Sequence, residues 1–353
     1  MLNSLTEIEK SDAENVARYL IANAEFPKKS RWLITGASGF LGSQILNVLV
    51  NLKELGYDCS ITAMDSGSRG GLRHWYFNNV DFIQHDITNA WPELEPHSHI
   101  LHLASIASPI YYRKFPLETL NANYLGTLNA LQVAEKWGSR ILLMSSSEIY
   151  GDPAKEFIPT NESYRGNVSS VGPRACYDEG KRVMETLGWI FETHHGVDVS
   201  IVRPFNFYGP GMRLDDGRVL PDFFGAISRD EDLVLHSDGT PTRSFCYSSD
   251  AVTALFSVLL SDENEKLFNV GNSDLEISMS ELAVVVAKEA RALGWEGSIK
   301  HTPSEDKNYL INNPNRRVPN LERLFKSTHW KAHVTLQEGI NRSLRHFLET
   351  EKI

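Results

Sequence analysis

The sequence has few cysteines. Cys59, Cys176 and Cys246 are the only three in 353 residues, and no two of them form a C-x-x-C pair. An odd and widely spaced set excludes a disulfide framework and argues against a structural zinc site, so we expect no metal. Three such thiols are typical of a protein that stays in the reducing cytoplasm.

Long apolar runs are also missing. No segment reaches the ~18 uncharged apolar residues of a membrane-spanning helix. The N-terminus carries Glu7, Glu9, Lys10 and Asp12 instead of the apolar stretch of a signal peptide. We therefore expect a cytoplasmic protein without a membrane partner. Basic residues number 35 against 45 acidic ones, a formal charge of −10, which excludes bulk nucleic-acid binding because that requires many phosphate neutralisations.

The sequence does contain a regular alternation of apolar and amphipathic segments. The expected strands are 32–34, 60–64, 80–83, 99–103, 140–144, 198–202 and 267–270. The expected helices are 40–55, 116–137, 176–194, 275–292 and 335–350. Strands that alternate with helices are typical of βαβ units, so we predict an α/β fold with a doubly wound, mostly parallel sheet of the Rossmann type.

The pattern breaks after Pro204, where residues 207–250 are rich in Gly, Pro, Asp and Arg. We expect a dinucleotide-binding domain over 29–205, to which 245–272 return. A smaller, discontinuous substrate lobe is expected from 206–244 and 273–353. Residues 1–28 predict a short polar helical extension that looks like an appendage, and no role can be read from its residues.

A glycine-rich segment follows the first expected strand. Gly36, Gly39 and Gly42 have the spacing G-x-x-G-x-x-G and lead into a helix. Such glycines allow a tight turn and a close approach of pyrophosphate to the helix N-terminus. Asp65 ends the second strand, where a carboxylate would hold the adenosine ribose and repel a 2′-phosphate. The order of these features predicts NAD rather than NADP, although Arg69 slightly weakens that preference.

Tyr177 and Lys181 are spaced i, i+4 on an expected helix and therefore share a face. A tyrosine with its ordinary pKa of ~10 cannot act as a base at neutral pH unless a nearby cation favours the phenolate. Lys181 is placed to do this, so the pair indicates a proton-transfer site. The alternative is an ordinary solvated pair on a helix surface.

These motifs resemble the extended short-chain dehydrogenase/reductase family, many of whose members modify nucleotide sugars. The resemblance is carried by 35–42, Asp65, Asp86, 102–105, 145–151 and the Tyr177–Lys181 pair. Within the family, the segments most similar to UDP-glucuronate decarboxylases (UDP-xylose synthases) are 172–182 (GPRACYDEGKR), 203–206, 216–219 and 242–247. The resemblance covers about residues 30–350.

The resemblance implies NAD as cofactor and assigns residues to three roles. The implied NAD contacts are Gly36, Ser38, Gly39, Phe40, Leu41, Gly42, Asp65, Asp86, Ile87, Leu103, Ala104, Ser105, Tyr177 and Lys181. The implied catalytic residues are Ser146, Ser147, Glu148, Tyr177, Lys181 and Arg218. The implied substrate contacts are Asn206, Arg218, Arg243, Tyr247 and Arg317.

The implied reaction is the decarboxylation of a nucleotide-linked uronic acid, UDP-glucuronate to UDP-xylose through a 4-keto sugar. Ser146 would bond the C4 oxygen and Arg218 would meet the carboxylate, while Arg243 and Arg317 would hold the diphosphate. Family dehydratases have aspartate where Ser147 stands, which argues against dehydration. A 4,6-dehydratase, a 4-epimerase and a non-catalytic NAD-binding protein remain alternatives.

The chain departs from the decarboxylase pattern on the substrate side. Gly211 stands where arginine is usual and Ile106 where proline is usual, and segment 317–320 differs at its second and last residues. Tyr111 and Tyr112 could border the sugar or belong to the core.

The resemblance also implies a homodimer, because two helices per subunit form a four-helix interface in that family. The apolar residues that favour this arrangement are Leu120, Tyr124, Leu128, Leu131, Val183, Leu187 and Ile190.

Overall fold

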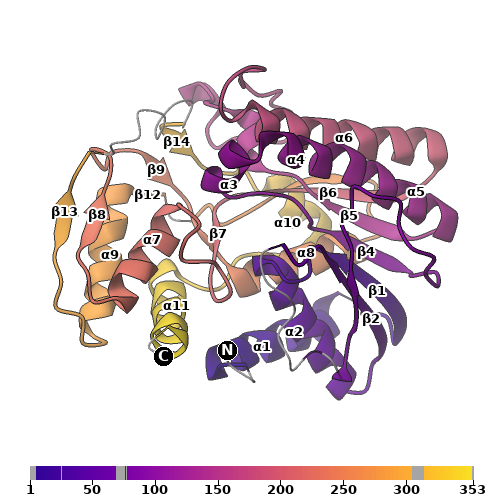
Figure 1. Ribbon diagram of the computed structural model, residues 1–353, viewed down its shortest axis with the longest axis horizontal. Helices are drawn as coiled ribbons and strands as arrows, with labels where there is room; N and C mark the ends of the chain where they lie inside the picture. Colours follow the sequence, from indigo (N-terminus) through magenta and orange to yellow (C-terminus); the bar gives the residue numbers. More distant parts are fainter. Residues whose placement is uncertain are drawn as a thin grey trace.

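The computed structural model describes residues 5–24, 26–68, 76, 78–274, 276–303 and 314–351. Its centre is a seven-stranded sheet in the order β11-β6-β5-β4-β1-β2-β3, and every neighbouring pair in it is parallel (Figure 1). The strands are β1 (Lys29–Thr35), β2 (Asp58–Asp65), β3 (Asp81–Gln84), β4 (His99–His102), β5 (Arg140–Met144), β6 (Asp198–Pro204) and β11 (Leu267–Val270). The expected doubly wound Rossmann sheet is thereby confirmed.

Helices cover both faces of this sheet. One face is covered by α2 (Phe40–Glu54) and α8 (Ser248–Leu260), and the other by α5 (Thr127–Trp137) and α6 (Ala175–His195). The chain reaches α5 through α4 (Pro116–Asn121) and a π-helical turn, η2 (Ala122–Gly126). The central strands are therefore apolar without alternation, as Trp32, Leu33 and Ile34 in β1 are all fully buried.

The direction in which successive strands are added to the sheet reverses at β1. β1 lies between β2 and β4, so the connections leave it toward opposite sides of the sheet. A crevice forms outside the carboxyl ends of the strands at such a reversal, and this is where doubly wound proteins bind ligands.

The second lobe is built around its own apolar core. Its helices and strands are α7 (Val219–Ser228), β8 (Leu233–Leu235), α9 (Met279–Arg291), β13 (Ile299–His301) and α11 (Leu336–Thr350). Three short strands, β12 (Ile277–Ser278), β9 (Thr242–Arg243) and β14 (Arg316–Arg317), form a small sheet. Two more, β7 (Phe207–Tyr208) and β10 (Cys246–Tyr247), pair where the chain passes between the lobes. The lobe thus faces the carboxyl ends of the Rossmann strands (Figure 1).

The N-terminal helix is an integral part of the fold, which differs from the appendage that the sequence led us to expect. α1 (Glu7–Asn23) packs against α2, α8 and α11, and Ala13, Val16, Ala17 and Leu20 are buried in the main core. Most residues of this segment are polar, and the narrow apolar stripe of alanine, valine and leucine that packs against the core was therefore not recognised in the sequence.

Three helices are among the elements that were not expected. α8 was missed, α3 (Pro109–Lys114) was missed, and α10 (Glu322–Thr328) returns to pack on β11 and α8. Leu324 of α10 lies in the core of the sheet domain, so residues 273–353 do not belong to the second lobe alone. Within the described ranges, no helix combines the length and the apolar character that crossing a membrane requires.

Candidate active site

A cavity of about 1130 Å³ lies between the two lobes. Its walls come from the carboxyl ends of β1, β2, β4 and β5 on one side, and from residues 211–213, 216–223, 234–237, Arg243 and Arg317 on the other. A site for one drug-sized ligand has about 300–1,000 Å³. This cavity therefore has room for a dinucleotide and a second ligand together.

The glycine-rich turn closes tightly beneath the first turn of α2. Gly36 has a φ of 68°, and a Cβ there would lie 2.8 Å from the Ala104 Cα. A Cβ on Gly42 would lie 2.3 Å from the Gly36 carbonyl oxygen, so the helix can approach the turn only without a side chain. Free N–H groups at the start of α2 consequently face the cavity, an arrangement that fits a pyrophosphate.

Asp65 ends β2 at the rim of the same cavity. Its Oδ2 accepts a hydrogen bond from the Ser38 amide over 3.1 Å, and its Oδ1 accepts one from the Gly67 amide over 2.9 Å. These bonds orient the carboxylate beside the glycine-rich turn, where it can receive the hydroxyls of a ribose. Arg69 lies outside the described residues.

Every residue that the resemblance assigned to NAD lines this cavity. The segment after β3 contributes Asp86 and Ile87. The segment after β4 contributes Leu103, Ala104 and Ser105. The glycine turn, the oriented carboxylate and the apolar segment after β4 together fit the phosphates, the ribose and the rings of NAD.

Tyr177 and Lys181 lie one turn apart on α6, and both are buried in the cavity wall. The Lys181 Nζ donates to the Met144 carbonyl over 2.7 Å. Burial lowers the pKa of Lys181 to about 7 and raises the pKa of Tyr177 to about 12, although a hydrogen bond with Ser146 and the charge of Arg218 act to lower the latter. In this structure burial is the largest influence on the pKa of Tyr177.

The segment after β5 brings three polar residues to the cavity. Ser146 caps a short 3₁₀ helix, η3 (Ser147–Tyr150), and its Oγ accepts from the Glu148 amide over 3.1 Å. Ser146, Ser147 and Glu148 all line the cavity, and Ser147 is buried. The structure thus places the three expected residues beside Tyr177.

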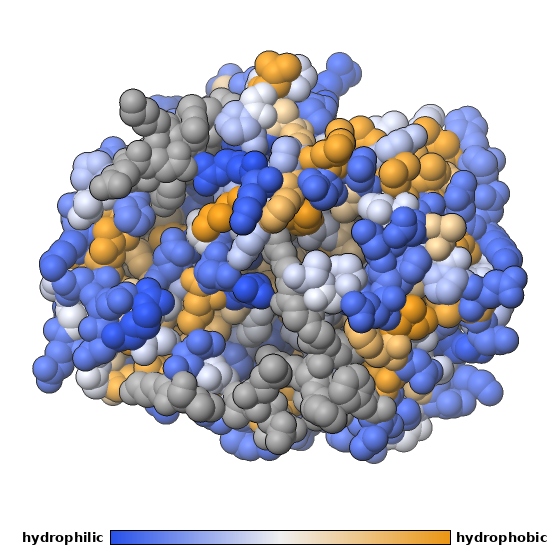
Figure 2. All heavy atoms as spheres, viewed as in Figure 1, coloured by the Kyte–Doolittle hydropathy of each residue, from blue (hydrophilic) through white to orange (hydrophobic). Residues whose placement is uncertain are grey.

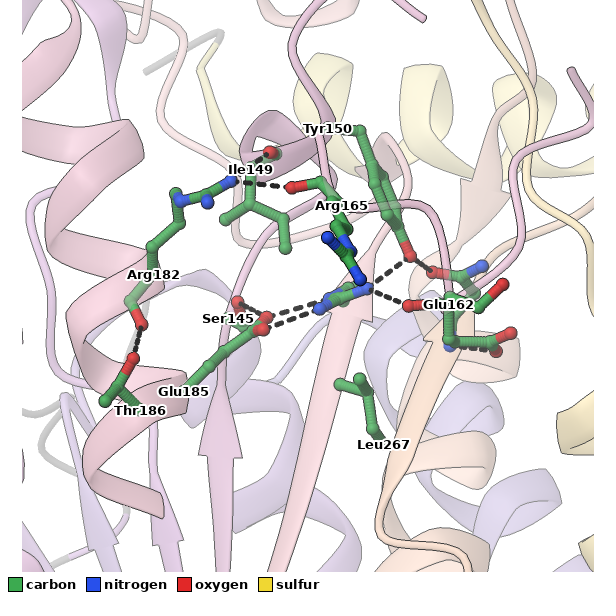
Figure 3. A network of polar contacts seen from close by, with 12 residues as sticks. Ser145, Ile149, Tyr150, Glu162, Arg165, Arg182, Glu185, Thr186 and Leu267 are labelled. Atoms are coloured by element: carbon green, nitrogen blue, oxygen red, sulfur yellow. Dashed lines mark hydrogen bonds and ion pairs between the residues drawn. The ribbon is translucent and has the colours of Figure 1, made fainter. Parts of the chain in front are cut away.

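A buried arginine on β6, Arg203, fixes this segment against α6. Figure 3 shows Ser145, Tyr150 and Glu185 around this point. Arg203 donates to both carboxylate oxygens of Glu185, over 2.8 and 2.6 Å, and to the Tyr150 hydroxyl over 2.7 Å. Ser145 donates to the same Glu185 carboxylate over 2.5 Å. Because β5, β6 and α6 are tied at one point, the residues around Ser146 and Tyr177 share a rigid support.

Two arginines hold the carboxylate of Glu148. Arg317 donates to both oxygens, with Nη2–Oε2 at 2.7 Å, and Arg174, the residue that precedes α6, binds Oε2 as well. Burial alone would raise the pKa of Glu148, but the two guanidinium groups outweigh burial and lower it to about 2. Glu148 is therefore ionised in this state, with both oxygens in use.

Arg243 stands beside Arg317 on the neighbouring strand, since β9 and β14 pair with these two residues in register. Arg243 donates to the Pro314 carbonyl over 2.6 Å and is almost fully buried, and burial lowers its pKa to about 9 with help from Arg317. Three guanidinium groups thus surround one carboxylate. This excess positive charge in a mainly acidic protein fits a diphosphate.

The other substrate residues divide into two groups. Asn206 and Arg218 line the cavity; Asn206 donates to the Ser244 carbonyl over 2.8 Å and Arg218 pairs with Asp216. Tyr247 does not reach the cavity. Its ring packs against Tyr208, and its hydroxyl donates to Asp12 of α1 over 2.6 Å.

The placement of Tyr247 corrects the expected substrate contact. Residues two apart share a face of a continuous strand, but Phe245 precedes β10 and lines the cavity, whereas Tyr247 in β10 is buried in the core of the second lobe. Its partner Asp12 lies near the other end of the sequence, so no residue close to Tyr247 in the sequence indicated this hydrogen bond.

Two residues at the site had no assigned role. Arg174 contacts Glu148, and Tyr112 of α3 stacks on the Tyr177 ring with centroids 5.1 Å apart and planes at 15°. Arg174 lies within the segment that carries the resemblance, which was a usable signal, whereas Tyr112 was ambiguous between the core and the site. Among the residues that the structure describes, no group of histidine, cysteine and carboxylate side chains could hold a metal ion.

The family and the relatives that this chain resembles are consistent with a site that binds NAD. The model of the NAD dependent epimerase/dehydratase family matches residues 32–271, and the chain belongs to this family. UDP-glucuronic acid decarboxylase 6 of Arabidopsis thaliana is 38% identical over 319 residues, which are 89% of this chain and 88% of the relative. UDP-glucuronic acid decarboxylase 1 of Xenopus tropicalis is 37% identical over 90% of this chain and 72% of the relative.

Solved structures share the fold at lower identity. A UDP-glucose 4-epimerase of Thermotoga maritima superimposes with a TM-score of 0.78 at 23% identity, covering 91% of this chain and 99% of the other. A dTDP-glucose 4,6-dehydratase of Streptomyces venezuelae, solved with NAD bound, has a TM-score of 0.77 at 22% identity, with coverage of 90% and 97%. These neighbours support the architecture of two lobes around one cavity.

Proposed function

We propose that this protein is an NAD-dependent carboxy-lyase that converts UDP-glucuronate to UDP-xylose through a 4-keto sugar. The observation that carries the proposal is the convergence of Tyr177, Ser146 and Arg218 in one cavity. A proton acceptor for a sugar hydroxyl and a cation for a sugar carboxylate thereby face the same space. The decarboxylase relatives, at up to 38% identity over 319 residues, support this choice of substrate.

The glycine turn, Asp65 and the residues after β4 hold NAD. When bound, NAD supplies a positively charged acceptor for the hydride that leaves C4 of the sugar. Tyr177 takes the proton of the C4 hydroxyl, while Ser146 holds the C4 oxygen by a hydrogen bond. Arg243 and Arg317 fix the diphosphate, so the sugar is presented to Tyr177 in one orientation.

Oxidation at C4 places a ketone β to the C5 carboxylate. The bond from C5 to the carboxylate then breaks, carbon dioxide leaves, and the electron pair passes to the C4 oxygen as an enolate. Ser146 and Tyr177 stabilise this oxyanion by hydrogen bonds. Protonation of C5 by a solvent proton on the Arg218 side restores the C4 ketone. Tyr177 would then return its proton to the C4 oxygen while the hydride passes back from the reduced cofactor to C4, which would complete the pentose with no net redox change.

Ser147 favours decarboxylation over dehydration. Dehydration needs an acid at this position to assist loss of a hydroxyl, and the serine hydroxyl, buried at 3% exposure, does not titrate near neutral pH. Glu148, the neighbouring carboxylate, is held by two arginines in this structure. We therefore rank a 4,6-dehydratase or a 4-epimerase below the decarboxylase.

The test is incubation of the pure protein with NAD and a panel of nucleotide sugars, followed by mass spectrometry. We expect UDP-glucuronate to lose the mass of carbon dioxide and UDP-glucose to remain unchanged. Conversion of UDP-glucose to a dehydrated or epimerised product, with UDP-glucuronate ignored, would replace the proposal by one of its sister reactions.

We also propose a homodimer formed through α4, η2, α5 and α6. Exposed apolar side chains on these elements support it: Leu117 and Trp189 are 65% and 57% exposed, and Leu120 and Tyr124 are exposed as well. Figure 2 shows hydrophobic residues gathered over this region. Leu131 is fully buried within its own chain and so cannot contribute as expected. A monomer mass in light scattering at micromolar concentration would contradict the dimer.

We infer the cytoplasm because Cys59, Cys176 and Cys246 are all free thiols, as is usual in a reducing compartment. Fractionation of cells that express the protein, followed by detection in the cytosolic fraction, tests this inference.

A further inference from the structure

The short helix α3 contacts both sides of the active site. Its adjacent residues Tyr111 and Tyr112 point in different directions, because successive residues of a helix are about 100° apart. The Tyr112 ring is buried and stacks on the ring of Tyr177. The Tyr111 hydroxyl donates to Oδ2 of Asp215, in the loop that precedes α7, over 2.9 Å. One helix therefore touches the proposed base on α6 and a loop of the second lobe.

The same loop carries Arg218, and α3 holds it at two further points. The Ser108 Oγ donates to the Asp216 carbonyl over 2.9 Å. Gly217 has a φ of 71° and lies so close to Ile110 that a Cβ would be 2.6 Å from the Ile110 Cδ1. Three consecutive loop residues, 215–217, are thus held by residues 108–111.

The loop held by α3 also carries a group that is proposed to act on the substrate. The buried carboxylate of Asp216 pairs with Arg218, whose guanidinium group lines the cavity. The charge of Arg218 acts on Tyr177, where it lowers the pKa of the phenol against the effect of burial. The distance between these two groups is therefore set through α3.

We propose that Tyr111 is a positioning residue which, through Asp215, holds the Arg218 loop at a fixed place relative to Tyr177. This inference rests on the proposed function for the reaction that it serves. Oxidation and hydride return occur at C4 beside Tyr177, whereas loss of carbon dioxide and protonation occur at the adjacent C5 on the Arg218 side. Both groups must stay in place through all the steps.

A loose loop has a specific chemical consequence. If the loop that carries Arg218 moves away from the cavity after carbon dioxide has left and before the hydride returns, the 4-keto pentose nucleotide escapes and NADH remains. Tyr111 therefore determines how the intermediate divides between UDP-xylose and the 4-keto product.

The principal test is Tyr111→Phe, which removes the hydroxyl and keeps the ring. We expect the ratio of 4-keto product to UDP-xylose, measured by mass spectrometry and by NADH absorbance, to rise about tenfold, the effect of one lost hydrogen bond to a charged group. Without substrate, amide hydrogen exchange should become faster in residues 213–218 and stay unchanged in residues 229–235. This second readout does not depend on turnover.

Two further variants separate the Tyr111–Asp215 contact from a general loss of structure. Asp215→Asn should raise the same ratio, and the double variant Tyr111→Phe/Asp215→Asn should be no worse than Asp215→Asn alone, because both act through one contact. Glu231→Gln is the matched control: Glu231 accepts from Arg229 two residues before it over 2.9 Å, as Asp215 does from Arg213, but lies beyond the opposite end of α7 from the Arg218 loop. It should leave the ratio at the wild-type value.

The outcomes are distinguishable. An unchanged product ratio and unchanged exchange in Tyr111→Phe would overturn the inference. Additive effects of Tyr111→Phe and Asp215→Asn would overturn it as well. A wild-type protein that leaves UDP-glucuronate intact would overturn the proposed function instead, and the exchange measurement would still decide whether Tyr111 holds the loop.

Discussion

Arg317 and Glu148 are 169 positions apart in the chain, yet the Arg317 Nη2 donates to the Glu148 Oε2 over 2.7 Å. Arg317 belongs to β14 of the second lobe and Glu148 to η3 at the end of a Rossmann strand. The pair therefore joins the two lobes across the floor of the cavity. Loss of one partner would leave the other charge buried and uncompensated, which makes the contact important for both stability and binding.

Glu148→Gln should destabilise the protein at pH 7, by about 3 kcal/mol, because Arg317 and Arg174 lose their buried counter-charge. The pKa of Glu148 in the folded protein, about 2, lies below its ordinary 4.5. The stability it contributes is therefore complete above about pH 4.5 and is lost as the pH falls through about 2. Urea unfolding at a series of pH values should show a shallower acid loss in the variant.

The exposed Glu231→Gln serves as its control, since Glu231 is 57% exposed and pairs only at the surface. Its stability at pH 7 should stay within about 0.5 kcal/mol of the wild type. Equal acid slopes in Glu148→Gln and the wild type would show that the arginines do not hold the carboxylate in the folded state.

Tyr247→Phe should reduce stability and leave substrate binding unchanged. The hydroxyl donates to the buried carboxylate of Asp12, which also accepts from Arg342. Its removal should cost about 1–3 kcal/mol of unfolding free energy, as is usual for a buried hydrogen bond to a charge. Thermal unfolding and titration with UDP provide the two measurements. A weaker UDP affinity at unchanged stability would restore Tyr247 to the substrate site.

The contrast between Tyr247 and Gly36 shows what the sequence can predict. The glycine turn and the Tyr177–Lys181 pair are local patterns, whose geometry follows from the turn or helix that contains them. Tyr247 sits in a strand of two residues, and its partner Asp12 comes from α1. No local period distinguishes the cavity side from the core side in so short a strand.

The contact between Arg243 and Arg317 also could not be predicted from local sequence patterns. Arg243 and Arg317 were assigned to one ligand by resemblance, but their adjacency depends on the pairing of β9 with β14, which no nearby residue encodes. α8 was missed for a different reason. Because it is buried on all sides, from Ser248 to Leu259, its sequence has no amphipathic period. The long amphipathic segments, in contrast, were predicted to within a few residues.

Asp65→Asn should narrow the preference for NAD over NADP. Asp65 is held by Ser38 and Gly67 at the expected ribose position, where its charge would repel a 2′-phosphate. The wild type should bind NAD more tightly by calorimetry, and the variant should gain affinity for NADP. Asp58→Asn is the control, because Asp58 begins the same strand at its exposed far end. Equal affinities of the wild type for both cofactors would contradict the assignment.

Arg218→Ala should severely reduce turnover of UDP-glucuronate while NAD binding is retained. Arg218 lines the cavity opposite the glycine turn and pairs with Asp216, so its removal takes a cation from the C5 side only. Loss of one charge-assisted contact at a reacting centre costs about 2–4 kcal/mol, or about 30- to 1000-fold in rate. The control is Arg229→Ala at the other end of α7, which is exposed and should leave the rate unchanged.

Comparison with Tyr177→Phe locates the step at which Arg218 acts. Without the Tyr177 hydroxyl the C4 proton has no acceptor, so no NADH absorbance should appear on addition of UDP-glucuronate. The Arg218→Ala variant retains Tyr177 and should form NADH in a first turnover. The reaction should then stall, because carbon dioxide loss and C5 protonation occur where the Arg218 side chain has been removed. If Arg218→Ala instead behaves as Tyr177→Phe does, with no NADH formed, Arg218 acts at the oxidation, through its charge on Tyr177, and its role at C5 is wrong.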